Sequence, residues 1–419
     1  MIATLTNNRL VMALRMAFYP AFETAEAKRF QALTREAQNA RNEGDLALAE
    51  QLYLRAIADA QASSDQSHLH FMRYGLAQVY HEQERYREAE VILCDELKEA
   101  IKSRQSNTQV HAAHLHLARL YQAQGEVAKA EEHYTAALAE TEKPELSAGS
   151  ELYFSTALWL ARFYVEQHRY ADAEPLFQRA LETREVDRGQ DPSFPYYLLE
   201  FAKVYEAQEK YAAAEDLYRR SLRLSEESEQ PKDFSVVRAL DELARFCRTR
   251  GRYAEAEDLS RRSLALVEIK MTDQIVAITK GRLQRQNREM LDAQIKRARV
   301  PISASVDRLA EIYEAQEKYA EAEPLRKRSL EIKQQAYGER TAWIWVDSLA
   351  AYANALHKIG REDEAAQLDE QVEAIRAKFP EGSVRTSVRL TSRPIKRTLR
   401  RRFFMFMNAL RQPSRTRNN

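Results

Sequence analysis

The stretch KYAEAE at residues 318–323 decides the fold, because near-copies of it recur along the chain. The copies read RYREAE at 85–90, RYADAE at 169–174, KYAAAE at 210–215 and RYAEAE at 252–257. With the aromatic residue taken as the anchor, and weaker copies included, the eight anchors are Leu46, Tyr86, Val127, Tyr170, Tyr211, Tyr253, Tyr319 and Glu362. Successive anchors lie 40 to 43 residues apart, except for one step of 66 residues. A fixed period of this length predicts a repeat protein.

A second pattern precedes the anchors and indicates the secondary structure. Leucine and alanine stand ten and nine residues before the anchor, and an aromatic follows the alanine by three, as in Leu76-Ala77-x-x-Tyr80. An alanine also stands three residues after every anchor. Spacings of three, four and seven are helical, and alanine lets two helix axes approach closely. The sequence therefore predicts an all-α fold of helix-turn-helix units.

The residue two positions before each anchor marks the turn between the two helices. Four units carry glycine there, where a helix end needs a left-handed residue: Gly44, Gly125, Gly251 and Gly360. Three further units carry glutamate and one carries histidine: Glu84, Glu209, Glu317 and His168. We predict that these four turns are tighter or slightly strained.

This constellation of motifs resembles the tetratricopeptide repeat. The period of about 42 residues and the AEPL strings at 173–176 and 322–325 are similar to the kinesin-light-chain type. The resemblance implies a right-handed superhelical solenoid of about eight repeats over residues 27–379. It also implies a platform for protein partners, with no catalytic activity.

The resemblance implies that the residue after each Leu-Ala pair points into a groove formed by the first helices. Four of these residues are cations: Arg119, Arg162, Lys203 and Arg245. Two more cations, Arg238 and Arg248, lie near them, and Trp159 stands three positions before Arg162. Such a basic ladder suits an acidic peptide or an acidic helix. Neighbouring acids leave a second interpretation open, a network of internal salt bridges: Glu166, Glu200, Glu206, Asp241 and Glu242. Trp159 either anchors a partner or packs against a neighbouring helix.

The carboxyl-terminal segment 380–419 differs in charge from the rest of the chain. After Glu381 there are eleven basic residues and no acidic one, so residues 1–381 have a net charge of −10. Between Pro394 and Pro413 we predict a basic amphipathic helix. Its docking residues are Arg397, Arg400, Arg401, Arg402, Phe403, Phe406 and Leu410. This helix suits an anionic membrane or a membrane complex, and the alternatives are RNA contact or an unstructured tail.

Two other segments fall outside the regular repeat. We expect the apolar residues 1–26 to cap the first hairpin, since Arg15 and Pro20 interrupt them and make a membrane span unsuitable. The long step contains an insertion at about 270–300, which is either an extended helix projecting from the solenoid or a solvated helical spacer.

The sequence offers no motif for chemistry. Two cysteines, Cys94 and Cys247, form no disulfide or zinc pattern, which fits a reducing, cytoplasmic environment with peripheral membrane contact through the tail. The histidine cluster His111, His114 and His116 has no further ligand that would complete a metal set. We therefore predict no catalytic residue, metal or cofactor.

The leading hypothesis is a protein-protein scaffold or adaptor, such as an assembly factor or a peripheral subunit. The alternatives are an RNA-associated repeat protein and a peptide-binding regulator.

Overall fold

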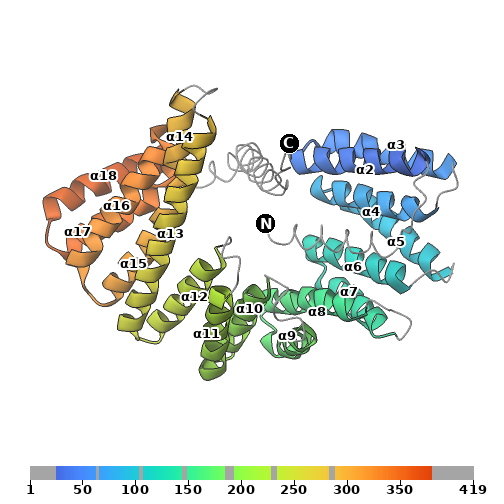
Figure 1. Cartoon of the computed structure of the whole chain (residues 1–419), viewed down its shortest axis with the longest axis horizontal. Helices are drawn as coiled ribbons and strands as arrows, with labels where there is room; N and C mark the ends of the chain where they lie inside the picture. Colours follow the sequence, from blue (N-terminus) through green and yellow to red (C-terminus); the bar gives the residue numbers. More distant parts are fainter. Residues whose placement is uncertain are drawn as a thin grey trace, which may run out of the picture. The chain divides into compact units, whose positions relative to one another are not determined.

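The computed structural model describes residues 25–62, 66–102, 107–143, 149–184, 193–227, 234–282 and 288–379. Throughout these residues the regular structure is helical, as the periodicity predicts. The described chain forms two compact units, which meet in sequence between Leu146 and Ser147. Each unit is a stack of antiparallel helix pairs (Figure 1).

The first unit contains three hairpins, and we call it the α2–α7 unit. Its helices are α2 (Ala25–Glu43), α3 (Leu46–Ala62), α4 (Gln66–Glu82), α5 (Tyr86–Lys102), α6 (Asn107–Gln124) and α7 (Val127–Thr141). Within each hairpin the two helices pack on each other, and α3 packs on α4 as α5 packs on α6. Stacking therefore buries the face that a single hairpin leaves exposed.

The second unit contains five hairpins and one additional helix, and we call it the α8–α18 unit. Its first hairpins are α8 (Gly149–Glu166) with α9 (Tyr170–Arg184), α10 (Phe194–Ala207) with α11 (Tyr211–Glu227), and α12 (Ser235–Thr249) with α13 (Tyr253–Arg282). The additional helix is α14 (Arg288–Ala298). The last hairpins are α15 (Val300–Ala315) with α16 (Tyr319–Tyr337), and α17 (Val346–Lys358) with α18 (Glu362–Lys378), joined by the 3₁₀ helix η2 (Glu339–Ile344).

All eight anchors are the first residue of the second helix in a hairpin. The residue two positions earlier has a positive φ in every unit, between 58° and 80°. Glycine and non-glycine turns also share one hydrogen-bond pattern: the amide of Asp45 donates to Ala40 O, and the amide of Lys210 donates to Tyr205 O, both at 2.9 Å. The prediction of tighter turns is therefore wrong. The strain is present instead as a left-handed conformation at residues that have a Cβ atom.

The alanine three positions after each anchor lies at the closest approach of the helices. All eight of these alanines are fully buried. Four units also bury an aromatic ring one helical turn later: Tyr53, Tyr134, Phe177 and Tyr218. In the α15–α16 hairpin the corresponding residue is Arg326, whose buried guanidinium is satisfied by Glu314 at 2.7 Å and Asp307 at 3.2 Å. The repeat thus keeps its backbone geometry while the side chains that fill it change.

The last glutamate of the KYAEAE motif joins one hairpin to the next. It follows the buried alanine and accepts a hydrogen bond from the cation that stands just before the next anchor. Four such pairs, with N–O distances of 2.6 to 3.2 Å, are Arg85 with Glu50, Lys210 with Glu174, Arg252 with Glu215, and Arg361 with Glu323. These inter-hairpin pairs explain why both charges recur with the repeat.

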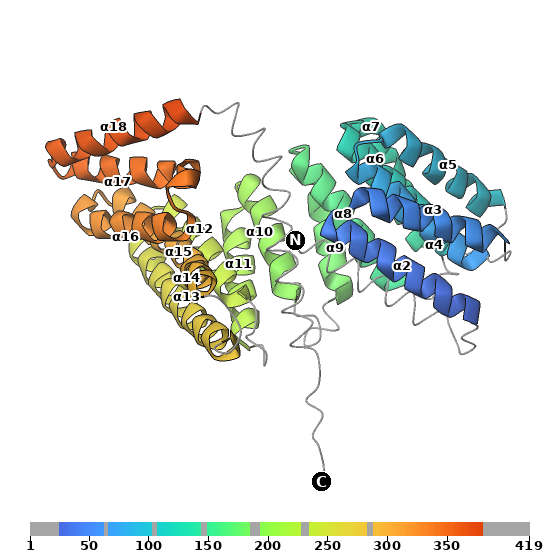
Figure 2. The same ribbon diagram turned by 90° about the horizontal axis from the view of Figure 1, so that it is seen from above.

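The insertion between the sixth and seventh hairpins lengthens α13 and adds α14. Along α13, Val267 and Met271 are buried against Ile302 and Val306 of α15. Helix α14 packs against α13 and α16, and Figures 1 and 2 show it beside the end of α13. The described part of the insertion is therefore attached to the unit along both of its helices.

Candidate protein-binding face

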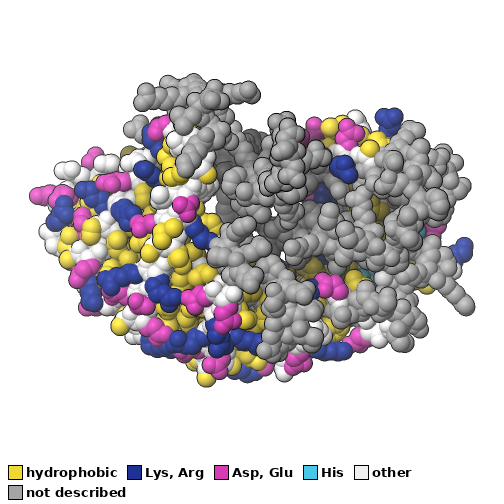
Figure 3. All heavy atoms as spheres, in the orientation of Figure 1, with side chains coloured by type: hydrophobic (Ala, Val, Ile, Leu, Met, Phe, Trp, Pro, Cys, Tyr) yellow, Lys and Arg dark blue, Asp and Glu magenta, His cyan; other side chains and the backbone are white. Residues whose placement is uncertain are grey.

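The predicted ladder is divided between the two units. Arg119 lies on α6 of the α2–α7 unit, whereas Arg162, Lys203 and Arg245 lie on α8, α10 and α12 of the α8–α18 unit. These three helices are the first helices of successive hairpins, so the cations follow one another at the repeat spacing. Positive and negative side chains also alternate over the visible face of the α8–α18 unit (Figure 3).

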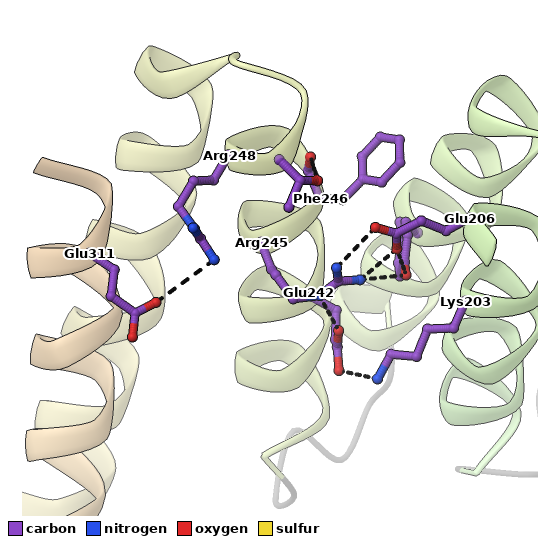
Figure 4. A network of polar contacts seen from close by, with 9 residues as sticks. Lys203, Glu206, Glu242, Arg245, Phe246, Arg248 and Glu311 are labelled. Atoms are coloured by element: carbon purple, nitrogen blue, oxygen red, sulfur yellow. Dashed lines mark hydrogen bonds and ion pairs between the residues drawn. The ribbon is translucent and has the colours of Figure 1, made fainter. Parts of the chain in front are cut away.

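The central cation of this unit, Arg245, is held by two acids. Its Nη2 donates to Glu206 Oε2 at 2.6 Å, and its Nε donates to Glu242 Oε2 at 3.1 Å. The buried Tyr218 hydroxyl donates to the same Glu206 oxygen at 2.8 Å. Burial opposes ionisation of Glu206, but the hydrogen bonds from Arg245 and Tyr218 outweigh it and keep the pKa of that carboxyl below its ordinary value. Figure 4 shows this network between α10 and α12.

Two of the other predicted cations are paired in the same way. Arg162 Nη2 donates to Glu200 Oε2 at 2.6 Å, and Lys203 forms an ion pair with Glu242. Each pair links the first helices of two neighbouring hairpins. These contacts correspond to the salt-bridge interpretation that the sequence left open.

The remaining predicted residues have looser contacts. Arg248 and Glu311 form an ion pair across α12 and α15 at 3.9 Å (Figure 4). The Arg238 guanidinium lies 5.1 Å from the ring centroid of Tyr196, and it makes no ion pair with a described residue. Trp159 is half-buried, with its ring 5.7 Å from the Arg162 guanidinium carbon.

A groove of about 410 Å³ lies between α12 and α15, with Ser260 of α13 also lining it. The buried side chains of Val237, Ala244 and Ile312 give it apolar walls, and the half-exposed ring of Phe234 lies at one end. Its charged lining residues are Arg238, Arg245, Arg248, Arg308, Asp241, Glu242 and Glu311. The groove thus combines an apolar interior with a charged rim, which is typical of sites that bind peptide segments.

The acceptors of this rim are hydrogen-bonded or ion-paired within the chain, whereas some of its donors are not. Asp241 accepts from Ser263 at 2.6 Å and pairs with Arg308 at 2.7 Å, yet burial raises the pKa of Asp241. The Nε of Arg308 is buried without a hydrogen-bond partner among the described residues. With Arg238 unpaired in the same part of the chain, the unused capacity of the rim consists of donors. Such a rim fits a ligand that carries acceptors, above all a carboxylate.

Sequence reasoning missed Arg308, Ile312 and Phe234. Arg308 stands just before Leu309-Ala310, the position that Trp159 and Glu242 occupy in other units. That register was the available signal for Arg308. Nothing in the sequence indicated Phe234, because it lies between helices where the repeat has no fixed register.

The histidine cluster is tied into the packing of α6 and α7. His114 Nδ1 lies 2.9 Å from His133 Nδ1, and His111 is buried. Among the described residues no three histidine, cysteine or carboxylate side chains are placed to hold a metal ion. Over the same residues, no helix has both the length and the apolarity that crossing a bilayer requires.

The predicted tail residues lie outside the described residues, as do residues 1–24. The tail positions concerned are Arg397, Arg400, Arg401, Arg402, Phe403, Phe406 and Leu410. Their docking role stays a prediction from the sequence.

Family models match much of the chain. A model described as tetratricopeptide repeat matches residues 152–227, 193–269 and 302–378. A second model with the same description matches residues 113–148. No curated protein sequence matches the chain.

Two of the similar solved structures, with TM-scores above 0.5, show the same fold at low identity. A STAND protein with a tetratricopeptide repeat sensor from Pyrococcus horikoshii is 13% identical with a TM-score of 0.54, over 86% of this chain and 49% of its own length. The apo form of RapI is 13% identical with a TM-score of 0.52, over 75% of this chain and 78% of RapI. Kinesin-light-chain repeats from Podosopora anserina are 23% identical over 46% of this chain and 92% of theirs, with a TM-score of 0.40.

Proposed function

This chain belongs to the tetratricopeptide-repeat family, and on that premise we propose that it is a non-catalytic scaffold that holds a segment of a protein partner in the groove between α12 and α15. The observation that carries the proposal is the difference between the acidic and the basic side chains of the groove rim. Its acids are engaged within the chain, whereas Arg238 makes no ion pair with a described residue and can offer its donors to a ligand. The partner segment therefore carries an acidic residue beside an apolar one, which enters between Val237 and Ile312.

The internal salt bridges support this specificity. Because Arg245 is already held by Glu206 and Glu242, it contributes little new attraction to an acidic ligand. It does hold α12 at a fixed spacing from α10, while the Asp241–Arg308 pair joins α12 to α15, so the groove is preorganised before a partner arrives. Recognition then depends on the loosely held cations, Arg238 and Arg248, more than on the ladder as a whole.

The test compares full-length variants in affinity purification from source cells, with partners quantified by mass spectrometry. Reversing the two loosely held cations, Arg238→Glu with Arg248→Glu, is expected to reduce recovery of the groove partner at least about tenfold, because each lost charge contact is worth about 1 kcal/mol or more. The matched control is Arg223→Glu on the exposed face of α11. Equal recovery with both variants, given unchanged melting temperatures, contradicts the proposal.

The tail supports a second, separate element of the proposal. Eleven cations without an acid in residues 382–419 suit docking on an anionic membrane or on a membrane complex, as for an assembly factor or a peripheral subunit. Flotation with phosphatidylserine vesicles is expected for the full chain and not for a chain ending at Glu381. Binding to RNA with a steep salt dependence, and no flotation, favours the RNA-associated alternative. If partners depend on the groove variants alone, the peptide-binding regulator is favoured.

A further inference from the structure

Helix α13 is the longest of the described helices, and its second half leaves apolar side chains exposed. It spans 30 residues, whereas the second helices of the other hairpins span 15 to 19. Its inner side, with Val267 and Met271, is buried against α15. On its outer side, Ile269 is 60% exposed and Val276 is 43% exposed. Figures 1 and 2 show α13 on the outside of the α8–α18 unit, and hydrophobic side chains gather over it in Figure 3.

The residues on this outer side are spaced as in a coiled coil. Alanine or β-branched residues follow one another at alternating intervals of four and three, and we call them the α13 seam: Ala265, Ile269, Thr272, Val276 and Thr279. The first four are exposed and the last is half-buried. Alternation of four and three keeps such residues in one narrow line on a helix, where a second helix can pack. Four of the five are β-branched, so their side chains have little conformational freedom to lose when they are covered.

The two threonines do not make the seam polar. Thr272 Oγ1 donates to Glu268 O at 2.8 Å, and Thr279 Oγ1 donates to Ile275 O at 2.7 Å. A hydroxyl that is bonded within its own helix needs no partner outside that helix. The seam can therefore be covered by another helix without leaving a buried donor unsatisfied.

The charges beside the seam change sign along the helix. Glu268 and Asp273 flank its first part, whereas Lys280 and Arg282 belong to the end of α13. Glu268 also pairs with Arg328 of α16 at 2.5 Å, and Asp273 has no ion pair with a described residue. A second α13 in the parallel direction would set like charges side by side. In the antiparallel direction it sets the acidic part of one helix beside the basic end of the other.

We infer that two copies of this chain associate through the α13 seam, with their α13 helices antiparallel. A two-fold axis near residue 274 sets Ile269 of one copy against Thr279 of the second copy, and Thr272 against Val276. Each of the four layers formed in this way contains one isoleucine or one valine. A second copy is the partner that this surface fits, because one short segment supplies both the apolar seam and the charges that complement it.

The association should be weak. The seam is only about 21 Å long at 1.5 Å per residue, so we expect a dissociation constant of about 1–100 µM. Self-association through α13 does not depend on what the groove between α12 and α15 binds. It would bring two such grooves into one assembly, which favours partners that carry two matching segments.

Sedimentation velocity of the full chain tests this inference, at loading concentrations from about 1 to about 200 µM. The average mass should rise with concentration from 48.5 kDa toward twice that value. Ile269→Glu with Val276→Glu should weaken the association at least about tenfold, because the pair would have to bury charges without partners. The matched control is Ala277→Glu, which is exposed on the same helix and off the seam, and it should associate as the wild type does. A wild-type chain that stays monomeric at the highest concentration overturns the inference, and so does equal association of the glutamate variant and the control.

A charge exchange ties any loss of association to the seam itself. Ile269→Lys with Val276→Lys should weaken self-association as the glutamate variant does. An equimolar mixture of the two variants should associate at least about tenfold more tightly than either one alone, because opposite charges then meet across the seam. Unchanged far-ultraviolet circular dichroism shows that both variants fold, as expected for substitutions of exposed side chains. A mixture that associates no more than its components contradicts pairing through α13.

Discussion

The left-handed turns allow two substitutions of opposite sign within one unit. Gly251 and Glu209 occupy equivalent positions, with φ values of 73° and 60°. A Cβ atom added at Gly251 would meet no atom within 4 Å, so Gly251→Ala changes only the backbone preference. Glu209 is exposed, and its side chain has no hydrogen bond or ion pair with a described residue, so Glu209→Gly removes no contact.

The expected magnitudes come from two opposing effects. A left-handed conformation costs a residue with a Cβ atom about 1–2 kcal/mol relative to glycine. Glycine in turn loses about 0.5–1 kcal/mol more chain entropy on folding. Gly251→Ala should therefore lower the free energy of unfolding by about 1 kcal/mol, and Glu209→Gly should raise it by about 0.5–1 kcal/mol.

Equilibrium urea unfolding followed by far-ultraviolet circular dichroism measures both changes. The double variant should lie close to the wild type, because the two turns are separate sites whose effects add. A Glu209→Gly variant no more stable than the wild type would show that the turn strain is relieved elsewhere in the chain. A Gly251→Ala variant of unchanged stability would refute the reasoning for the whole repeat.

Two predictions concern the α2–α7 unit. An alanine at Gly75 would place its Cβ atom 2.3 Å from the Tyr53 ring, which is fully buried and cannot move aside. Gly75→Ala should therefore lower the free energy of unfolding in urea by about 1–3 kcal/mol. A change below about 0.5 kcal/mol would contradict the packing described. The hydrogen bond to Glu96 raises the pKa of His70, so the stabilisation by His70 is fully present below about pH 6.5 and is lost as the pH rises through the folded value. His70→Asn should therefore destabilise the unit more at pH 6 than at pH 8.5, and a loss that grows with pH would refute this sign.

The sequence predicted where the turn of each helix pair lies. Each anchor begins a helix because it follows a turn whose left-handed residue ends the previous one. The nature of those turns was predicted less well. Glutamate and histidine suggested a different, tighter turn, but the stacking of hairpins imposes the same conformation on every sequence. Tertiary packing outweighs a local cost of about 1–2 kcal/mol.

The candidate site was predicted in its parts and not in its arrangement. Arg162, Lys203 and Arg245 could be named from the repeat register, and so could the acids near them. Which acid meets which cation depends on contacts between residues 38 or 39 positions apart, such as Arg162 with Glu200. The groove between α12 and α15 depends on how adjacent hairpins pack beside the insertion, and a single-repeat pattern contains no information on that packing.

The inter-hairpin pairs also have a mechanical consequence. At the four interfaces where this charged contact joins one hairpin to the next beside the buried alanine, the interface should resist pulling in a similar way. A chain stretched from its ends would then yield one hairpin at a time. Each release of about 42 residues would add up to about 140–150 Å of extended chain, so the force record should be a sawtooth of nearly even steps, apart from one longer step for the 66-residue repeat.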